Sequence, residues 1–180
     1  MRKLFFATIL IACAASFSFA QSNDDYNKYD VYVGYTHARV DLGGGDREGF
    51  NGVEGAVTGN ISRYVGLKAD YAFHFKSFDG APVNVDAKTH TLVGGVQFKD
   101  NSKETKVKPF AHLMVGLTNG RVSGLVSDTE TGFSGVIGGG LDLRVSPRVD
   151  IRLVQFDYNP THLDGQTQHS FRIGAGIVIR

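Results

Sequence analysis

The chain has 180 residues, a length typical of one domain, and its 19 lysines and arginines nearly balance 18 aspartates and glutamates. A near-neutral chain lacks the basic face that nucleic-acid binding requires, so we expect no nucleic-acid partner. Glycine is abundant, with 23 residues, and tryptophan is absent. Beyond residue 28, helical periodicity is hard to find and apolar and polar residues alternate throughout, which predicts an all-β protein.

The first twenty residues have the layout of a secretory signal peptide. Arg2 and Lys3 provide a positive start, an apolar run follows, and Ser18-Phe19-Ala20 supplies small residues for cleavage. The apolar run is shorter than the roughly 20 residues that a transmembrane helix needs. We therefore expect residues 1–20 to be a signal peptide cleaved after Ala20, followed by a short N-terminal segment at 21–28.

A second interpretation of the N-terminus stays open. Leu10-Ile11-Ala12-Cys13 is similar to a lipobox, in which case Cys13 would carry a lipid and cleavage after Ala20 would not occur. Cys13 is the one cysteine of the chain. In either case we expect an exported protein held together without disulfides, by backbone pairing and packing.

Eight alternating segments follow, and each predicts one strand. The expected strands are 29–40, 50–60, 64–76, 86–98, 107–118, 132–145, 149–158 and 169–180. Short connections at 61–63, 99–106 and 146–148 alternate with longer ones at 41–49, 77–85, 119–131 and 159–168. Phe156 and Tyr158 break the parity of the seventh strand, which predicts a β-bulge near Val154 and Gln155. This pattern predicts that residues 29–180 form one eight-stranded, antiparallel, up-and-down β-barrel.

One face of the predicted strands is apolar, with aromatic residues such as Tyr35 and Phe171 near its ends. Aromatic girdles at both membrane interfaces are typical of transmembrane barrels, whose apolar face is turned outward into lipid. The positions that we expect to face lipid are Val31, Val33, Tyr35, Val65, Leu67, Tyr71, Phe73, Leu113, Val115, Leu141, Phe171, Ile173 and Ile177.

The other face combines glycines with charged residues of both signs. An eight-stranded barrel has an interior only just filled by side chains, and unpaired buried charge is costly. We therefore predict a network of paired charges in the lumen. Its expected members are Glu54, Lys68, Asp70, Asp142, Arg144, Asp150, Arg152 and Arg172.

The export signal, the glycine placement and the alternation of short and long connections favour an outer-membrane barrel, with periplasmic turns and extracellular loops. The alternative is a soluble periplasmic lipocalin-like barrel that binds a ligand in an apolar interior. On that interpretation the charged face is simply a solvated exterior.

Catalytic and metal-binding constellations are not predicted. His37, His74, His90, His162 and His169 gather near the rim with the longer loops, but strand parity separates His74 from His37 and His90. His169 and Ser170 are neighbours in a strand and point to opposite faces, so they cannot form a dyad. We expect no enzyme activity, no cofactor and no metal.

Five segments, in this order along the chain, carry a family resemblance: 30–35, the hairpin at 52–75, Lys108-Pro109-Phe110-Ala111, Gly138-Gly139-Gly140-Leu141-Asp142 and 171–177. They resemble the OmpA-like family of small outer-membrane β-barrels, including opacity-type porin-like proteins. The resemblance implies a cell-outer-membrane location, contact with outer-membrane lipid, and the barrel-assembly machinery and periplasmic chaperones as partners during biogenesis. The chain departs from the family's pattern at Ile177-Val178-Ile179-Arg180, where members often end in an aromatic residue.

The expected function is therefore that of a non-enzymatic outer-membrane barrel with a structural or surface-interaction role. Its extracellular loops would carry any ligand recognition, because loops on a rigid scaffold commonly do so. A small passive porin-like channel is the alternative within the membrane, and it requires an unblocked lumen.

Overall fold

The chain folds into a closed barrel in the computed structural model, which describes residues 25–41, 47–78, 85–123, 128–163 and 166–180. The predicted signal peptide, Cys13 and residues 21–24 lie outside the described residues. The strands are β1 (Tyr29–Asp41), β2 (Arg47–Asn60), β3 (Val65–Phe78), β4 (Val85–Lys99), β5 (Val107–Ser123), β6 (Asp128–Ser146), β7 (Val149–Leu163) and β8 (Gln166–Ile179). Within these residues there is no helix long and apolar enough to cross a membrane.

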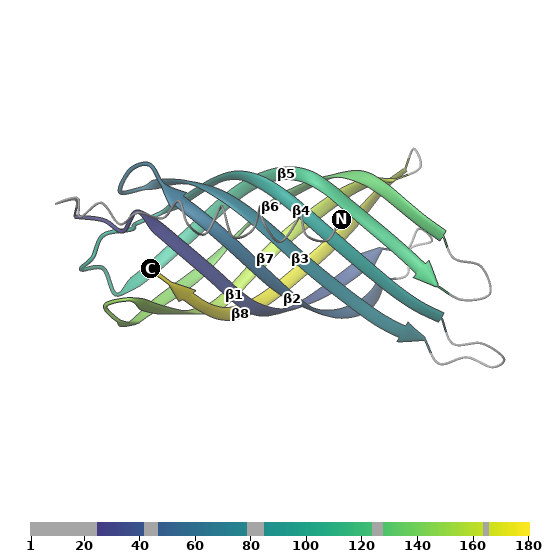
Figure 1. Ribbon diagram of the computed structural model, residues 1–180, viewed down its shortest axis with the longest axis horizontal. Coiled ribbons are helices and arrows are strands. Elements are labelled where there is room, and N and C mark those ends of the chain that lie inside the picture. The colour runs from purple at the N-terminus through teal and green to yellow at the C-terminus, as the bar shows by residue number, and fades with distance from the viewer. Residues whose placement is uncertain (1–24, 42–46, 79–84, 124–127, 164–165) are drawn as a thin grey trace, which may run out of the picture.

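Every strand is antiparallel to its neighbours in sequence, and β1 closes the barrel against β8 (Figure 1). The closing register runs from Val31 opposite Ile179 to Arg39 opposite Phe171. Closure leaves no strand edge to be satisfied by water or by another chain. The predicted eight-stranded, antiparallel, up-and-down barrel is confirmed.

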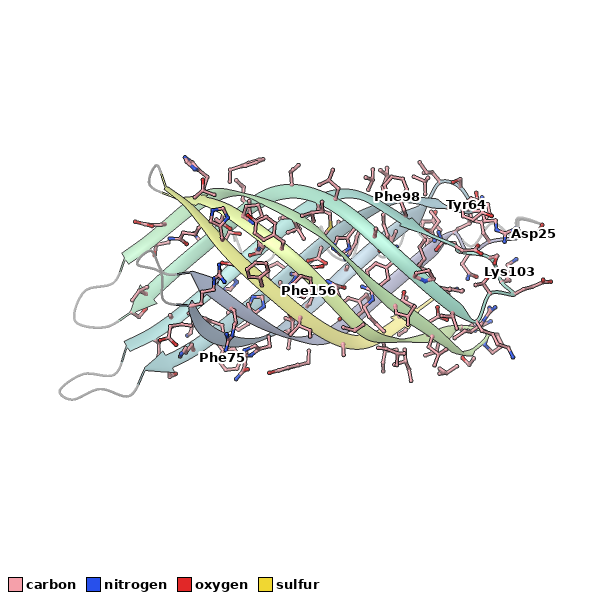
Figure 2. The ribbon with its side chains drawn as sticks, turned by 180° about the vertical axis from the view of Figure 1, so that it is seen from behind. Asp25, Tyr64, Phe75, Phe98, Lys103 and Phe156 are labelled. Carbon is pink, nitrogen blue, oxygen red and sulfur yellow. The ribbon has the colours of Figure 1, made fainter. Side chains whose placement is uncertain are left out.

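The two ends of the barrel differ in their connections. We call the turn end the one with the β2–β3, β4–β5 and β6–β7 connections, and the loop end the one with the other four connections (Figure 1). Residues 25–28 lie across the turn end: Tyr26 forms a bridge with Ser102, and the Asn60 side-chain amide donates to the carbonyl of Asn27 at 2.8 Å. Figure 2 shows Tyr64 and Lys103 at this end as well.

The predicted bulge in β7 is confirmed. The register between β7 and β8 shifts between Arg152 and Gln155. Consecutive residues Leu153 and Val154 both lie exposed on the outer face as a result. The shift returns Gln155 to the interior, so that the second half of β7 has the opposite parity to the first.

The strands at the loop end are longer than predicted. The expected loop at 119–131 is largely strand, because β5 continues to Ser123 and pairs with β6 from Asp128 onward. The expected loop at 159–168 is corrected in the same way by the pairing of β7 with β8 up to Leu163 and Gln166. The predicted strands ended where the alternation of apolar and polar residues stops, because both faces of the paired strands are polar there. The backbone hydrogen bonds between the strands continue beyond that point.

Candidate functional site

The outer surface of the barrel is apolar. All the positions predicted to face outward do lie on the outer face: Val31, Val33, Tyr35, Leu67, Tyr71, Leu113, Val115, Ile173 and Ile177 are exposed, and Val65, Phe73, Leu141 and Phe171 are half-buried among neighbours. Val33 is 62% exposed, whereas inward-facing Asp142 is 0% exposed. A contiguous apolar exterior of this extent is unusual for a protein surrounded by water.

Aromatic side chains lie toward both ends of this outer surface. Tyr64 and Phe98 lie at the turn end, and Phe75 lies toward the loop end (Figure 2). In the loop-end half, the Tyr71 hydroxyl lies 2.8 Å from Nδ1 of His90. Rings with one apolar body and one polar tip favour an interface between an apolar and an aqueous phase.

The interior holds seven of the eight predicted network residues, all with 3% or less exposure: Glu54, Lys68, Asp70, Asp142, Asp150, Arg152 and Arg172. Arg144 shares the face of Asp142, but no ion pair joins it to these groups in the part of the chain that the structure describes. This residue is half-buried at the β6–β7 turn, where its guanidinium donates to the carbonyls of Ser146 and Pro147 at 3.4 Å. In the ladder Arg144 lies opposite Asp150, before the irregularity that falls between Arg144 and Ser146, so it keeps the parity of Asp142 but lies at the end of the barrel.

Arg172 is the hub of the half of the network nearer the loop end. Its Nη2 donates to Asp157 Oδ2 at 2.5 Å and its Nη1 to Asp70 Oδ1 at 3.3 Å. Glu54 lies 3.6 Å from the same guanidinium. Lys68 then links Asp70 at 3.0 Å to Glu54 at 4.0 Å. Charges from β2, β3, β7 and β8 therefore meet around one guanidinium group.

Two uncharged side chains extend this cluster. His112 Nε2 donates to Asp157 at 2.9 Å, and Nδ1 accepts from the Lys68 ammonium at 3.4 Å. These contacts assign the neutral imidazole with its proton on Nε2. The Gln155 amide donates to Glu54 at 2.8 Å and to Asp157 at 2.7 Å, and its oxygen accepts from Arg152 at 2.6 Å.

Arg152 fills the barrel at the next level toward the turn end. It donates from Nε and Nη2 to both oxygens of Asp142, at 2.8 and 3.2 Å. Its guanidinium carbon lies 4.2 Å from the ring centre of Tyr32 and 4.0 Å from that of Phe110. The guanidinium is therefore paired with a carboxylate and stacked against two aromatic rings.

Glycines make room for those two rings. A Cβ atom at Gly34 would come within 2.2 Å of the Tyr32 hydroxyl, and one at Gly140 within 2.8 Å of the Phe110 ring. The space is occupied by the aromatic rings that contact Arg152.

A second cluster at the turn end adds four residues that were not predicted to join the network: Asp30, Lys99, Lys108 and Arg180. Lys99 lies 2.5 Å from Asp30 and 3.4 Å from Asp142, which joins this cluster to Arg152. Arg180 pairs with Asp30 at 3.5 Å and also with Asp150. Lys108 lies 3.7 Å from Asp150.

Two clusters of ion pairs, one around Arg172 and one from Arg152 to Arg180, therefore fill the interior, and hydrogen bonds of Gln155 to Arg152 and Glu54 join them. Among the described residues, six carboxylates and six cations take part: Asp30, Glu54, Asp70, Asp142, Asp150 and Asp157 with Lys68, Lys99, Lys108, Arg152, Arg172 and Arg180. Equal numbers of each sign remove the cost of uncompensated buried charge. On the loop side the network ends at Arg172, which also lines a cavity of about 270 Å³.

The histidines and hydroxyls do not assemble a reactive centre in the part of the chain that the structure describes. His74 points inward while His37 and His90 lie on the outer face, as the strand parity predicts. His169 is exposed and Ser170 is buried, on opposite faces of β8. No group of three or more His, Cys, Asp or Glu among the described residues is placed to hold a metal ion.

Comparison with known proteins identifies the family of this barrel with an apolar exterior and a charged interior. The sequence profile of the outer membrane protein beta-barrel domain matches residues 5–178. The chain belongs to this family. The barrel is thus an outer-membrane β-barrel. No curated protein sequence matches the chain significantly.

Solved structures show the same fold. The crystal structure of Neisserial surface protein A superimposes with a TM-score of 0.69 at 14% identity, over 87% of this chain and 99% of that chain. The crystal structure of Ail, the attachment invasion locus protein of Yersinia pestis, has a TM-score of 0.57 at 21% identity, over 84% of this chain and 97% of that chain. Ail in complex with the heparin analogue sucrose octasulfate has a TM-score of 0.59 at 20% identity, over 84% of this chain and 97% of that chain. Identities this low show a shared fold alone.

Proposed function

We propose that this protein is a non-enzymatic outer-membrane barrel with a closed lumen, whose role is structural or is exerted through interactions of its loop-end surface. The observation that carries the proposal is the network of two ion-pair clusters from Arg172 to Arg180, which Gln155 joins by hydrogen bonds. Its groups are almost completely buried, so the interior between them offers no aqueous path. Interactions with other molecules then fall to the surfaces of the barrel.

The proposal includes an orientation. The turn end, which has the tight β2–β3 and β6–β7 turns, faces the periplasm, and the loop end faces the cell exterior, as is usual for barrels of this architecture. The exposed outward residues between the two ends, among them Leu113, Val115 and Ile177, contact lipid. The Neisserial and Yersinia proteins with the same fold are named for the cell surface and for attachment and invasion, which agrees with a role at the loop end.

Planar-bilayer recording tests the closed lumen. The purified barrel is reconstituted and its conductance is compared with that of an Arg152→Ala variant, which removes the side chain between the Tyr32 and Phe110 rings. We expect no resolvable steps from the wild type. Reproducible single-channel steps from the wild type would instead establish the porin-like channel.

Cysteine labelling in intact cells tests the orientation. Thr131→Cys lies at the loop end of β6 and Arg148→Cys in the β6–β7 turn, and both positions are exposed. A membrane-impermeant maleimide should label Thr131→Cys in intact cells and Arg148→Cys only after the outer membrane is permeabilised. The reverse pattern would refute the orientation, and recovery of the unlabelled protein in the aqueous periplasm would favour the lipocalin-like alternative.

A further inference from the structure

Two cations lie next to each other on the outer face of the barrel, near its loop end. Lys88 of β4 and Arg121 of β5 are directly opposite each other in the register, and both are exposed. They share the outer-face parity of Leu92 and Leu117, which are 61% and 55% exposed. Directly opposed residues have Cβ atoms about 4.5–5.5 Å apart, and like charges in such positions destabilise a sheet. The pair therefore favours an anion that lies against both side chains.

Neither cation has an ion-pair partner in the part of the chain that the structure describes. Asp86 lies on the same face of β4, but one of its oxygens accepts a hydrogen bond from the Ser77 hydroxyl at 2.8 Å. The turn end differs, because exposed Arg63 pairs with Asp100 there at 3.0 Å. The loop-end pair thus keeps positive charge that a molecule outside the chain can meet.

Cations also predominate elsewhere on the outer face at the loop end. Arg39 of β1 and Arg47 of β2 are exposed there, and the guanidinium carbon of Arg47 lies 4.9 Å from the centre of the Phe171 ring. Together with the pair on β4 and β5 they make four cations, whereas Asp86 is the one acid among the outward side chains that the structure describes at this end. A patch of one sign attracts ligands of the opposite sign.

The pair lies at the level expected for lipid headgroups. Phe98 and Lys88 are ten positions apart on the same face of β4, and Figure 2 shows Phe98 and Phe75 toward opposite ends of the outer surface. Ten residues span about 34 Å along a strand, which is about 26 Å along the axis of a barrel whose strands are tilted by about 40°. The apolar band of an outer-membrane barrel is about 25 Å tall. Lys88, opposite Phe75 in the β3–β4 register, therefore lies at the loop-end edge of that band.

The surface next to the pair suits the apolar part of a lipid. Leu92 and Leu117 are opposite each other in the same two strands, and each lies four positions from a cation along its strand. A lipid whose phosphate lies between the two cations places its acyl chains along these leucines. Phosphate oxygens accept charge-assisted hydrogen bonds from both ammonium and guanidinium groups. A soluble anion would gain the charged contacts alone.

From these observations we infer that the outer face at Lys88 and Arg121 binds the phosphate group of an anionic lipid. The two cations hold the phosphate, and Leu92 and Leu117 contact its acyl chains. The inference rests on the proposed contact of the outer face with lipid. It goes beyond that contact, because it assigns one class of lipid to one place on the barrel.

The test places the isotope-labelled barrel in phosphatidylcholine nanodiscs with a rising mole fraction of phosphatidic acid, followed by amide chemical shifts. The shifts around Lys88 and Arg121 should saturate. In the Lys88→Gln, Arg121→Gln double variant, half-saturation of the shifts in this part of β4 and β5 should need about tenfold more phosphatidic acid, because each basic residue near a membrane surface adds to the attraction of anionic lipid.

A matched variant distinguishes this site from the effect of net charge. Lys106→Gln, Arg148→Gln removes the same charge from two exposed positions at the turn end. It should leave half-saturation at β4 and β5 unchanged. Inorganic phosphate added to plain phosphatidylcholine nanodiscs should give no saturable shifts there, because it has no acyl chains. Every variant is first checked for the gel shift of a folded barrel, so that loss of binding is not confused with loss of fold.

Three results would overturn the inference. The first is an absence of saturable shifts around the pair in the wild type. The second is an equal loss in the two double variants, which would assign the attraction to net charge. The third is saturation by inorganic phosphate, which would make this a site for a soluble anion. A barrel that does not enter plain phosphatidylcholine nanodiscs would instead contradict the proposed contact with lipid, so the two failures are distinguishable.

Discussion

Replacing Arg152 by methionine tests whether the interior network holds the barrel together. Methionine keeps an unbranched side chain between the rings of Tyr32 and Phe110, but it leaves Asp142 without its two-point partner. Removing one partner of a buried pair costs about 3–5 kcal/mol, because the remaining charge stays buried. Asp142 keeps Lys99 at 3.4 Å, so we expect a loss near the lower value, about 3 kcal/mol.

The assay is urea unfolding in phosphatidylcholine vesicles, with the folded fraction read from the mobility of unboiled samples on a gel. Arg144→Met is the matched control, because this arginine contacts only turn carbonyls at 3.4 Å in the described structure. Its loss should stay below about 1 kcal/mol, as for most surface substitutions.

A double variant with Asp142→Leu and Arg152→Met completes the cycle. With both charges gone, no uncompensated group remains between them, and Lys99 keeps Asp30 at 2.5 Å. The double variant should therefore be more stable than the sum of the two single losses by about 2 kcal/mol or more. Additive losses, or an Arg152→Met loss no larger than that of Arg144→Met, would refute the network as a source of stability.

Three further outcomes are expected from the same structure. Leu113→Arg places a charge on the exposed outer face and should cost about 2–4 kcal/mol in the vesicle titration, and a neutral effect would contradict contact with lipid. Gly140→Val brings a Cβ to 2.1 Å from the Val154 carbonyl oxygen and to 2.8 Å from the Phe110 ring, so it should cost about 1–3 kcal/mol; a wild-type unfolding midpoint would contradict close packing of β6 against β7 at this point. At the exposed turn, the hydrogen bond from Arg63 lowers the pKa of Asp100, so the small stabilisation that Asp100→Asn removes should be complete at pH 7 and shrink as the pH falls below about 4. A difference between wild type and Asp100→Asn that grows in acid would contradict this sign.

Strand parity was enough to predict the barrel and most of its interior. Because side chains alternate strictly between two faces, Val33 could be assigned to the outside and Arg172 to the inside from sequence spacing alone. The same spacing showed the β7 bulge, since Phe156 and Tyr158 fall out of phase with the residues before it. The alternation of side chains between the two faces of a strand does not depend on the neighbouring strands. The face of each residue can therefore be predicted without knowing the register.

The missing members of the network show where that reasoning stops. Asp157 lies beyond the bulge, where the parity depends on the exact site of the extra residue. Lys99 and Asp30 lie at strand ends, where a charge next to a turn is ordinarily solvated, and only the closed barrel shows that they are buried. Which carboxylate meets which cation depends on the stagger of all eight strands, which no single segment encodes.

The loop-end cavity follows from the same stagger. Phe50 and Ala38 are opposite each other in β1 and β2, but Thr118 and Thr161 face them across the barrel from strands distant in the sequence. Sequence parity identifies each of them as inward-facing. Their convergence around one space, where Nε2 of His74 has no hydrogen-bond partner among the described residues, could not be predicted from the sequence.

Closure of the lumen is a property of the side chains rather than of the strands. Eight strands enclose an interior that side chains just fill, so the same backbone can be blocked or passable depending on what projects inward. Here the inward residues are long cations and carboxylates that hold one another, with Arg152 fixed between two rings. Removing one member of an ion pair leaves its partner as an unpaired buried charge, which attracts water. Removing both members leaves a space without charge. Conductance in Arg152→Ala but not in the Asp142→Leu, Arg152→Met double variant would therefore show that uncompensated charge, and not empty volume, opens the barrel.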